Sequence, residues 1–183
     1  MRIVAGKFRS RVIDAVDGDK TRPTLDKVKE AVFSRIGPYF DGGNMLDLFG
    51  GSGNVSFEAL SRGMEHSILC DVSFKAISTM KKNAKILGVE NSIDIWKMDF
   101  KRALQQAKEL ELKFDFVYLD PPYKQQQIDL ILSYLSENNL LNDNADVVCE
   151  SLKEDEFQQT YGDLEQVKDV IYGITRITYY KKR

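Results

Sequence analysis

The fold of this 183-residue chain is decided by the stretch Asp47-Leu48-Phe49-Gly50-Gly51-Ser52-Gly53. It ends a predicted strand at 44–49 and leads into a predicted helix at 54–62. A glycine-rich turn between a strand and a helix lets the backbone approach a ligand closely. We therefore expect a cofactor cradle, made by Asp47, Phe49, Gly50, Gly51, Ser52 and Gly53.

Around this stretch the sequence alternates between strand and helix patterns. Strands are predicted at 44–49, 67–71, 92–97, 114–119 and 145–150, and helices at 54–62, 73–87, 100–111 and 126–138. Such alternation indicates a largely parallel sheet covered on both faces. Two further segments, 167–172 and 174–180, flank Gly173 and predict a closing antiparallel hairpin. The expected fold is a doubly wound α/β/α sandwich of three layers with seven strands.

Acidic residues follow the next two strands, at the sheet edge where such folds bind ligands. Asp71, with Val72 beside it, ends the second strand, where a carboxylate would meet the hydroxyls of a ribose. Asp99 and Phe100 follow the third strand and offer an acceptor and a ring for an adenine. Each acid has a structural alternative, because Asp71 could cap the helix from Ser73 and Asp99 could cap the next one.

The fourth strand ends in Asp120-Pro121-Pro122-Tyr123. Proline has no N–H and a fixed φ, so the carbonyl of Pro121 is held in one direction without neighbouring donors. Asp120 and this carbonyl could each accept one hydrogen of a nucleobase amine, while Tyr123 offers a face for stacking. The segment predicts a base-amine clamp; the alternative is an ordinary proline turn with a solvated aspartate.

Positive charge is concentrated near the N-terminus, although the whole chain has a net charge of −2. Residues 1–35 carry nine Lys and Arg against five Asp and Glu. The pattern predicts a β-hairpin extension over residues 1–20, ahead of a main domain over 21–183, with Gly6 at its bend. Its cations either contact RNA phosphates or form a solvated strand face; the candidates are Arg2, Lys7, Arg9 and Arg11.

The sequence gives little support for a metal site, for secretion or membrane insertion, or for nicotinamide binding. The chain has two cysteines and one histidine, without metal-ligand spacing, so we expect no metal, and Cys70 and Cys149 should be buried. There is no signal-peptide pattern and no membrane span, which predicts a cytoplasmic protein; we also expect a monomer. A nicotinamide-binding fingerprint requires Gly or Ala at position 56, where this chain has Ser56.

These motifs resemble those of class I S-adenosylmethionine-dependent methyltransferases with an N-P-P-Y-type amine site. The resemblance extends to the RsmD-type 16S ribosomal RNA (guanine-N2)-methyltransferases through Ile3 to Arg9, Thr21 to Thr24, Leu46 to Gly53, Glu58 to Gly63 and Tyr172 to Tyr180. It covers essentially the whole chain. Two departures are Gly51, where Ala is expected, and Phe100, where a small residue is usual.

The resemblance implies a Rossmann-like enzyme that uses S-adenosyl-L-methionine to methylate the N2 amine of one guanine in 16S rRNA, within the small subunit or its late precursor. It also implies that Arg22 contacts RNA and that Thr24 contacts the cofactor, although Thr24 could instead cap a helix starting at Leu25. Three alternatives stay open: methylation of DNA or another RNA, a cofactor-binding assembly factor without turnover, and methylation of a small molecule or protein glutamine.

Overall fold

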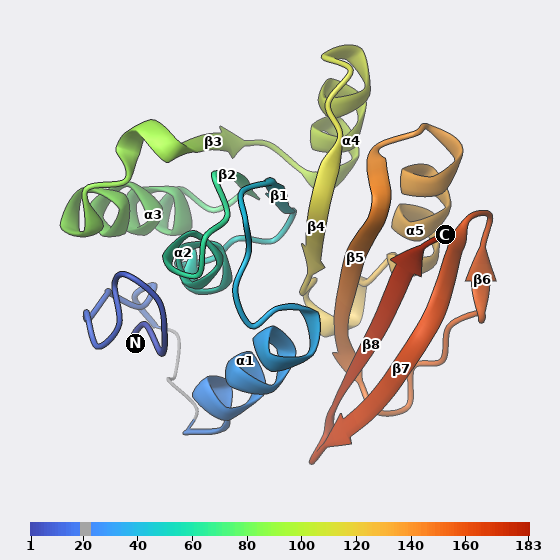
Figure 1. Ribbon diagram of the computed structural model, residues 1–183, viewed down its shortest axis with the longest axis horizontal. Helices are drawn as coiled ribbons and strands as arrows, with labels where there is room; N and C mark the ends of the chain where they lie inside the picture. Colours follow the sequence, from blue (N-terminus) through green and yellow to red (C-terminus); the bar gives the residue numbers. More distant parts are fainter. Residues whose placement is uncertain (19–22) are drawn as a thin grey trace.

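The chain forms one eight-stranded sheet with helices on both faces (Figure 1). The structure is a computed structural model that describes residues 1–18 and 23–183, and the side chains of 23–25 also lie outside the described part. The strand order is β3-β2-β1-β4-β5-β8-β7-β6. The strands are β1 (Asn44–Asp47), β2 (His66–Asp71), β3 (Ile93–Lys97), β4 (Phe114–Leu119), β5 (Leu141–Leu152), β6 (Thr160–Tyr161), β7 (Leu164–Tyr172) and β8 (Thr175–Lys182).

Strands β1 to β5 are parallel, and β6 to β8 add antiparallel pairs at one side. The predicted mostly parallel sheet with a terminal hairpin is therefore confirmed. The additional strand β6 has only two residues, too few for an alternating pattern to be visible in the sequence. This short strand makes the sheet eight-stranded where seven strands were predicted.

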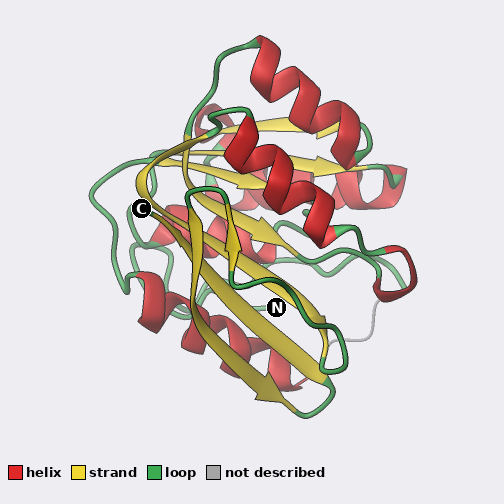
Figure 2. Ribbon diagram, turned by 90° about the vertical axis from the view of Figure 1, so that its right-hand side faces the viewer, coloured by secondary structure: helices red, strands yellow, loops and turns green. Residues whose placement is uncertain are grey.

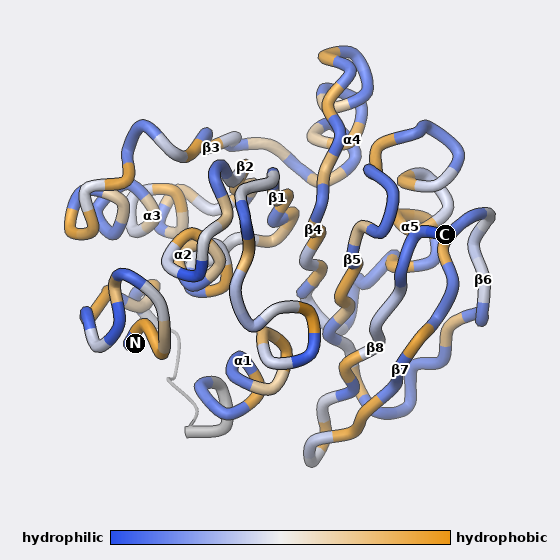
Figure 3. Tube along the Cα trace, viewed as in Figure 1, coloured by the Kyte–Doolittle hydropathy of each residue, from blue (hydrophilic) through white to orange (hydrophobic). Residues whose placement is uncertain are grey.

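In the described part of the chain, five α-helices form the two outer layers, and Figure 2 shows helices on either side of the sheet. They are α1 (Pro23–Ile36), α2 (Asn54–Ser61), α3 (Phe74–Leu87), α4 (Phe100–Glu109) and α5 (Ile128–Glu137). Helices α1, α2 and α3 pack into one apolar core, and α4 and α5 pack into a second one on the other face. Polar and apolar residues alternate along the helices in Figure 3, as expected for elements that bury one side.

The alternation of side chains along each strand builds the two cores. In β1, Met45 belongs to the core under α1, α2 and α3, whereas Leu46 belongs to the core under α4 and α5. Successive residues of a strand point to opposite faces, so a central strand must be apolar at nearly every position. The same alternation between the two faces decides which side chain at a strand end reaches a ligand.

The predicted N-terminal hairpin is held at a single antiparallel bridge, between Arg2 and Val12. Its two arms pair with each other, because Ile3 donates its N–H to the carbonyl of Arg11 and Ile13 donates its N–H to the carbonyl of Met1. Its bend bonds to α2: Lys7 donates its N–H to the carbonyl of Ser61, and Ser61 Oγ donates to the carbonyl of Ala5. Gly6 makes the predicted bend with φ 88°, and a Cβ there would lie 2.0 Å from the carbonyl oxygen of Ser61. This segment, the N-terminal loop, is therefore a short hairpin whose bend is fastened to α2.

Helix α1 begins at Pro23, two residues earlier than predicted. Proline is favoured in the first helical turn because its fixed φ suits the helix and its missing N–H needs no partner. Thr24 is consequently the second residue of the helix, whose start was predicted at Leu25. Within residues 1–18 and 23–183, no helix has the length and apolar character needed to cross a membrane.

Candidate active site at the carboxyl ends of the strands

A cavity of about 670 Å³ opens where the parallel strands end. Segments that follow β1, β2, β3 and β4 form most of its wall, and β5 completes it. Most of the predicted site residues line this one cavity: Phe49, Gly51, Asp71, Val72, Asp99, Phe100, Asp120, Pro121, Pro122 and Tyr123. Segments far apart in the sequence, from Leu48 to Glu150, are thus brought together by the sheet topology.

Four residues of the predicted cradle, Asp47, Gly50, Ser52 and Gly53, do not line the cavity. Asp47 is only 2% exposed, and its Oδ2 accepts a hydrogen bond from Ser56 Oγ at 2.9 Å, inside the layer between β1 and α2. Burial raises the pKa of Asp47 to about 7. Its position at the strand end was read correctly, but its side chain lies beneath the cavity wall.

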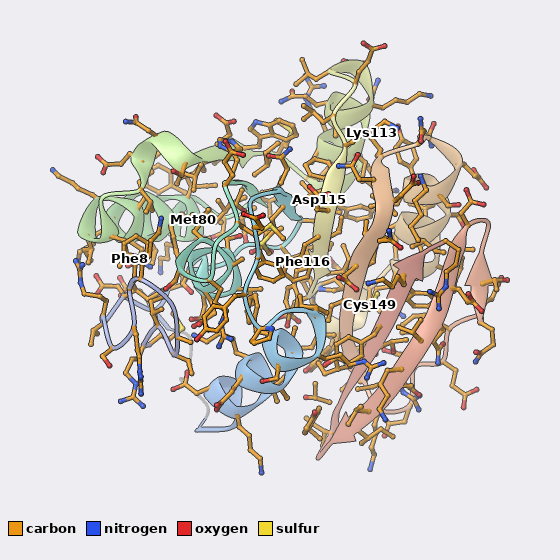
Figure 4. All side chains as sticks on the ribbon, in the orientation of Figure 1. Phe8, Met80, Lys113, Asp115, Phe116 and Cys149 are labelled. Carbon is orange, nitrogen blue, oxygen red and sulfur yellow. The ribbon has the colours of Figure 1, made fainter. Side chains whose placement is uncertain are left out.

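The glycines of the turn do not all have the same structural role. A Cβ at Gly50 would lie 2.6 Å from Met80 Cε, on the side chain labelled in Figure 4, and a Cβ at Gly53 would lie 2.3 Å from the Phe57 ring. These two glycines allow the turn to pack closely against the neighbouring elements. Gly51 has φ 57° with no atom within 4 Å of its would-be Cβ, and it lines the cavity. Only this glycine leaves backbone open to a ligand.

Asp71 joins two of the loops that form the cavity. Its Oδ2 accepts the N–H of Gly51 at 3.0 Å, and its Oδ1 accepts the N–H of Ser73 at 2.9 Å. The cap of α3 is Ser73, whose Oγ accepts the N–H of Ala76 at 3.3 Å. The alternative in which Asp71 caps this helix is therefore wrong, and two backbone donors fix its carboxylate at the cavity wall.

Asp99 combines the two roles that the sequence left open. It is the N-cap of α4, because Oδ1 accepts the N–H of Arg102 at 2.8 Å, and it also lines the cavity. The rings of Phe49 and Phe100 lie 5.7 Å apart beside it. Both rings pack at the edge of the second core together with Trp96. This side of the cavity offers an acceptor next to aromatic surface.

The segment Asp120–Tyr123 closes the opposite side of the cavity. Asp120 is partly buried, Pro121 is buried, and Tyr123 begins the 3₁₀ helix η2 (Tyr123–Gln125). The Tyr123 hydroxyl lies 3.5 Å from Thr175 Oγ1 of β8, across β5. The ring is thus anchored to the terminal hairpin, and all four residues of the predicted clamp line one cavity with Asp71 and Asp99.

The sequence reading missed four residues of the cavity wall: Leu48, Met98, Gln125 and Glu150. Glu150 is the most informative, because it is a carboxylate that is 9% exposed and accepts the hydroxyl hydrogen of Tyr118 at 2.6 Å. It is the last residue of the strand predicted at 145–150. The rule that located the other acids, reading the residues at each strand end, would have found it on the fifth strand.

Four of the predicted RNA-contacting cations, Arg2, Lys7, Arg9 and Arg11, are described, and they do not line the cavity. Arg2, Lys7 and Arg9 are exposed on the N-terminal loop, beside α2 and α3 in Figure 1. Arg11 is also exposed, and its guanidinium donates to the carbonyl of Ile86 at 2.7 Å, which holds the loop to α3. Arg22 and the side chain of Thr24 lie outside the described residues.

The cysteines are both buried, as predicted, and their thiols are unpaired. Burial raises the pKa of both thiols, so they behave as apolar side chains. Among the described residues, no three of His, Cys, Asp or Glu are grouped so as to hold a metal ion.

The structure titled "Putative methyltransferase yhhF from Escherichia coli" has the same fold, with a TM-score of 0.86 at 24% identity, covering 100% of this chain and 98% of that one. A putative methylase from Haemophilus influenzae is similar with a TM-score of 0.80 at 28% identity, covering 99% of this chain and 97% of that one. A cavity at the carboxyl ends of the strands is the expected ligand site of such a doubly wound sheet.

Residues 1–181 match the model of the family described as conserved hypothetical protein 95, and the chain belongs to this family, that of the RsmD-type methyltransferases. A Bacillus subtilis relative named "Putative rRNA methyltransferase YlbH" is 45% identical over 183 residues, 100% of both chains. The Haemophilus influenzae protein named "Ribosomal RNA small subunit methyltransferase D" is 34% identical over 158 residues, 84% of this chain and 80% of that protein. The family resemblance seen in the sequence is confirmed.

Proposed function

We propose that this protein transfers a methyl group from S-adenosyl-L-methionine to the exocyclic N2 amine of one guanine in 16S rRNA, within the small ribosomal subunit or its late precursor. The observation that carries the proposal is that a single cavity contains both the strand-end acids and the Asp-Pro-Pro-Tyr segment. The names of the relatives, one of them a ribosomal RNA small subunit methyltransferase, support the substrate class.

The cavity has the donor and acceptor groups that a nucleoside cofactor needs. Asp71 is held at the wall by two backbone donors and retains lone pairs for the hydroxyls of a ribose. Asp99 provides an acceptor for an adenine amine beside Phe100, and the open backbone at Gly51 permits close approach. S-adenosyl-L-methionine bound there supplies an electrophilic methyl group.

The clamp residues act on the target amine. Asp120 and the carbonyl of Pro121 each accept one hydrogen of the guanine N2 amine, which favours the pyramidal form of a nitrogen otherwise conjugated with the ring. Positive charge grows on this nitrogen during the reaction, and the Asp120 carboxylate stabilises that charge more than it stabilises the neutral amine. Tyr123 offers a stacking surface to a base that has left its own stack.

The N-terminal loop supplies the electrostatic part of RNA binding. Three exposed cations, Arg2, Lys7 and Arg9, lie outside the cavity and are free to meet phosphates. With a net charge of −2 on the whole chain, binding to naked RNA should be loose and sensitive to salt. A ribosomal particle, which presents a folded RNA surface, is the better substrate.

Transfer of labelled methyl tests the proposal. Purified protein and labelled S-adenosyl-L-methionine are incubated with small-subunit particles from cells lacking this gene, with naked rRNA and with DNA, followed by digestion to nucleosides. We expect N2-methylguanosine from the particles. N6-methyladenine from DNA would overturn the RNA assignment, and cofactor binding without label in any substrate would indicate an assembly factor.

A further inference from the structure

Glu150 and Tyr118 form a buried polar pair beside the clamp that the proposed reaction does not use. Glu150 is 9% exposed and lines the cavity, and the hydroxyl of Tyr118 donates to its Oε2 at 2.6 Å. The phenol is buried in β4 beneath the cavity. A carboxylate has about four acceptor sites, so it can accept hydrogen bonds from more than one group.

The sheet register places Glu150 next to Asp120. In the parallel pairing of β4 with β5, Tyr118 faces Val148 and Leu119 faces Cys149, so the next position pairs Asp120 with Glu150. Side chains at paired positions of parallel strands lie on the same face. The pKa of Tyr118 is raised by burial first, and then by the charges of both Glu150 and Asp120, which agrees with two carboxylates near one phenol.

Tyr123 limits where a base can enter. Its hydroxyl contacts Thr175, and Thr175 is paired with Leu152, two residues beyond Glu150 on β5. The ring therefore spans from the end of β4 toward β8, over the end of β5. A base stacked on Tyr123 would have one edge toward Asp120 and Glu150.

We propose that Glu150 accepts the N1–H of the target guanine and so selects guanine over purines whose N1 is an acceptor; this inference rests on the proposed function. Guanine presents two adjacent donors on its Watson–Crick edge, the N1–H and the N2 amine, which match two adjacent carboxylates. Adenine and 2-aminopurine present a lone pair at N1, which a carboxylate repels. Tyr118 is a positioning residue that fixes the orientation of Glu150.

The experiment compares guanine with 2-aminopurine, which keeps the 2-amino group but has no N1–H. Small-subunit particles are reconstituted with either base at the position that the wild-type protein labels, and kcat/KM is measured for both. We expect the wild-type protein to prefer guanine by at least about 100-fold, since a site built to accept a hydrogen bond rejects an analogue that lacks it.

Substitution Glu150→Gln should reduce this preference to less than about tenfold, because the carboxamide N–H can donate to the N1 lone pair of 2-aminopurine. The matched control is Glu154→Gln, the same change at an exposed residue outside the cavity, which should leave the preference unchanged. A purely structural loss at Glu150 would lower both kcat/KM values together and would not alter their ratio.

Tyr118→Phe provides a second test that keeps the ring packing and the carboxylate. Without the hydroxyl, Glu150 loses one fixed donor, and the guanine preference should fall by at least about threefold. An unchanged preference in both Glu150→Gln and Tyr118→Phe, with wild-type protein methylating guanine, would overturn the role of Glu150 alone. A wild-type protein that methylates no guanine would overturn the proposed function and this inference together.

Discussion

Asp47 and Asp71 end neighbouring parallel strands, yet their environments are opposite. Asp71 lines the cavity and accepts two backbone N–H groups from the loops around it. Asp47 is 2% exposed, is bonded to Ser56 of α2, and has a pKa raised to about 7 by burial. A strand end fixes which edge of the sheet an acid occupies, but the face toward which its side chain points decides whether it reaches a ligand.

The largest effect is expected at a third strand end, where Asp120 should resemble Asp71 in facing the cavity. Asp120→Ala should reduce turnover by at least about a hundredfold, equivalent to about 2.7 kcal/mol, because the amine loses an acceptor and its growing charge loses a counter-charge. Affinity for S-adenosyl-L-methionine, measured by calorimetry, should be nearly unchanged.

Asp115 on the same strand supplies the matched control. It is labelled in Figure 4 and lies at the other end of β4, where its carboxylate accepts hydrogen bonds from the Asn44 N–H and the Asn142 side chain. Asp115→Ala should preserve turnover per folded molecule while lowering thermal stability. Near-normal turnover of Asp120→Ala would refute the clamp.

An intermediate effect is expected at Asp71, in cofactor affinity. Asp71→Asn removes the charge and one of the acceptors at the cavity wall, and hydrogen bonds to a charged group contribute about 1.5–3 kcal/mol. The dissociation constant for S-adenosyl-L-methionine should rise at least about tenfold, measured by calorimetry. The same substitution at Asp47 should leave this dissociation constant unchanged. Equal losses of affinity at both positions would contradict the inference that only Asp71 faces the ligand.

The smallest functional effect is expected at Asp47, whose substitution should instead change how stability depends on pH. Burial raises the folded-state pKa of Asp47 to about 7 from its ordinary value of 3.8, so the folded chain keeps a proton that the unfolded chain releases between these values. The free energy of unfolding should therefore fall as pH rises from about 4 to about 7, with a slope of up to about 1.4 kcal/mol per pH unit from this group.

Urea unfolding of the wild type and of Asp47→Asn at several pH values isolates this contribution. The neutral amide cannot titrate, so the wild-type stability minus the variant stability should decrease through the same window and become level above about pH 7. A difference that does not vary with pH would mean that Asp47 is ionised in the folded chain.

Much of the fold could be predicted because the signals are local. Alternation between strand and helix patterns located the parallel sheet, and β4 was predicted with the bounds that the structure has, 114–119. Strand β6 was missed because two residues carry no period. The N-terminal hairpin was predicted, but not the attachment of its bend to Ser61 of α2, because that partner lies fifty-four residues from Lys7 and no local pattern reveals it.

Only those residues of the candidate site that lie at strand ends could be predicted from the sequence. Asp71, Asp99 and Asp120 follow strands and line the cavity, and the cap at Asp99 shows that a structural role does not exclude a place in the wall. Asp47 also lies at a strand end, but its bond to Ser56 of α2 comes from the packing between two elements, which no local pattern reveals. Glu150 ends the fifth predicted strand, and the same rule applied to that strand identifies it.

Trp96 gives this edge of the molecule an optical reporter. It is the single tryptophan of the chain, lies in β3 opposite Cys70, and packs against the core under α4 and α5. The tryptophan emission of the unmodified protein therefore arises from the β3 side of the sheet. Unfolding of this side can be followed without a label and separated from unfolding of the terminal hairpin, which carries tyrosines but no tryptophan.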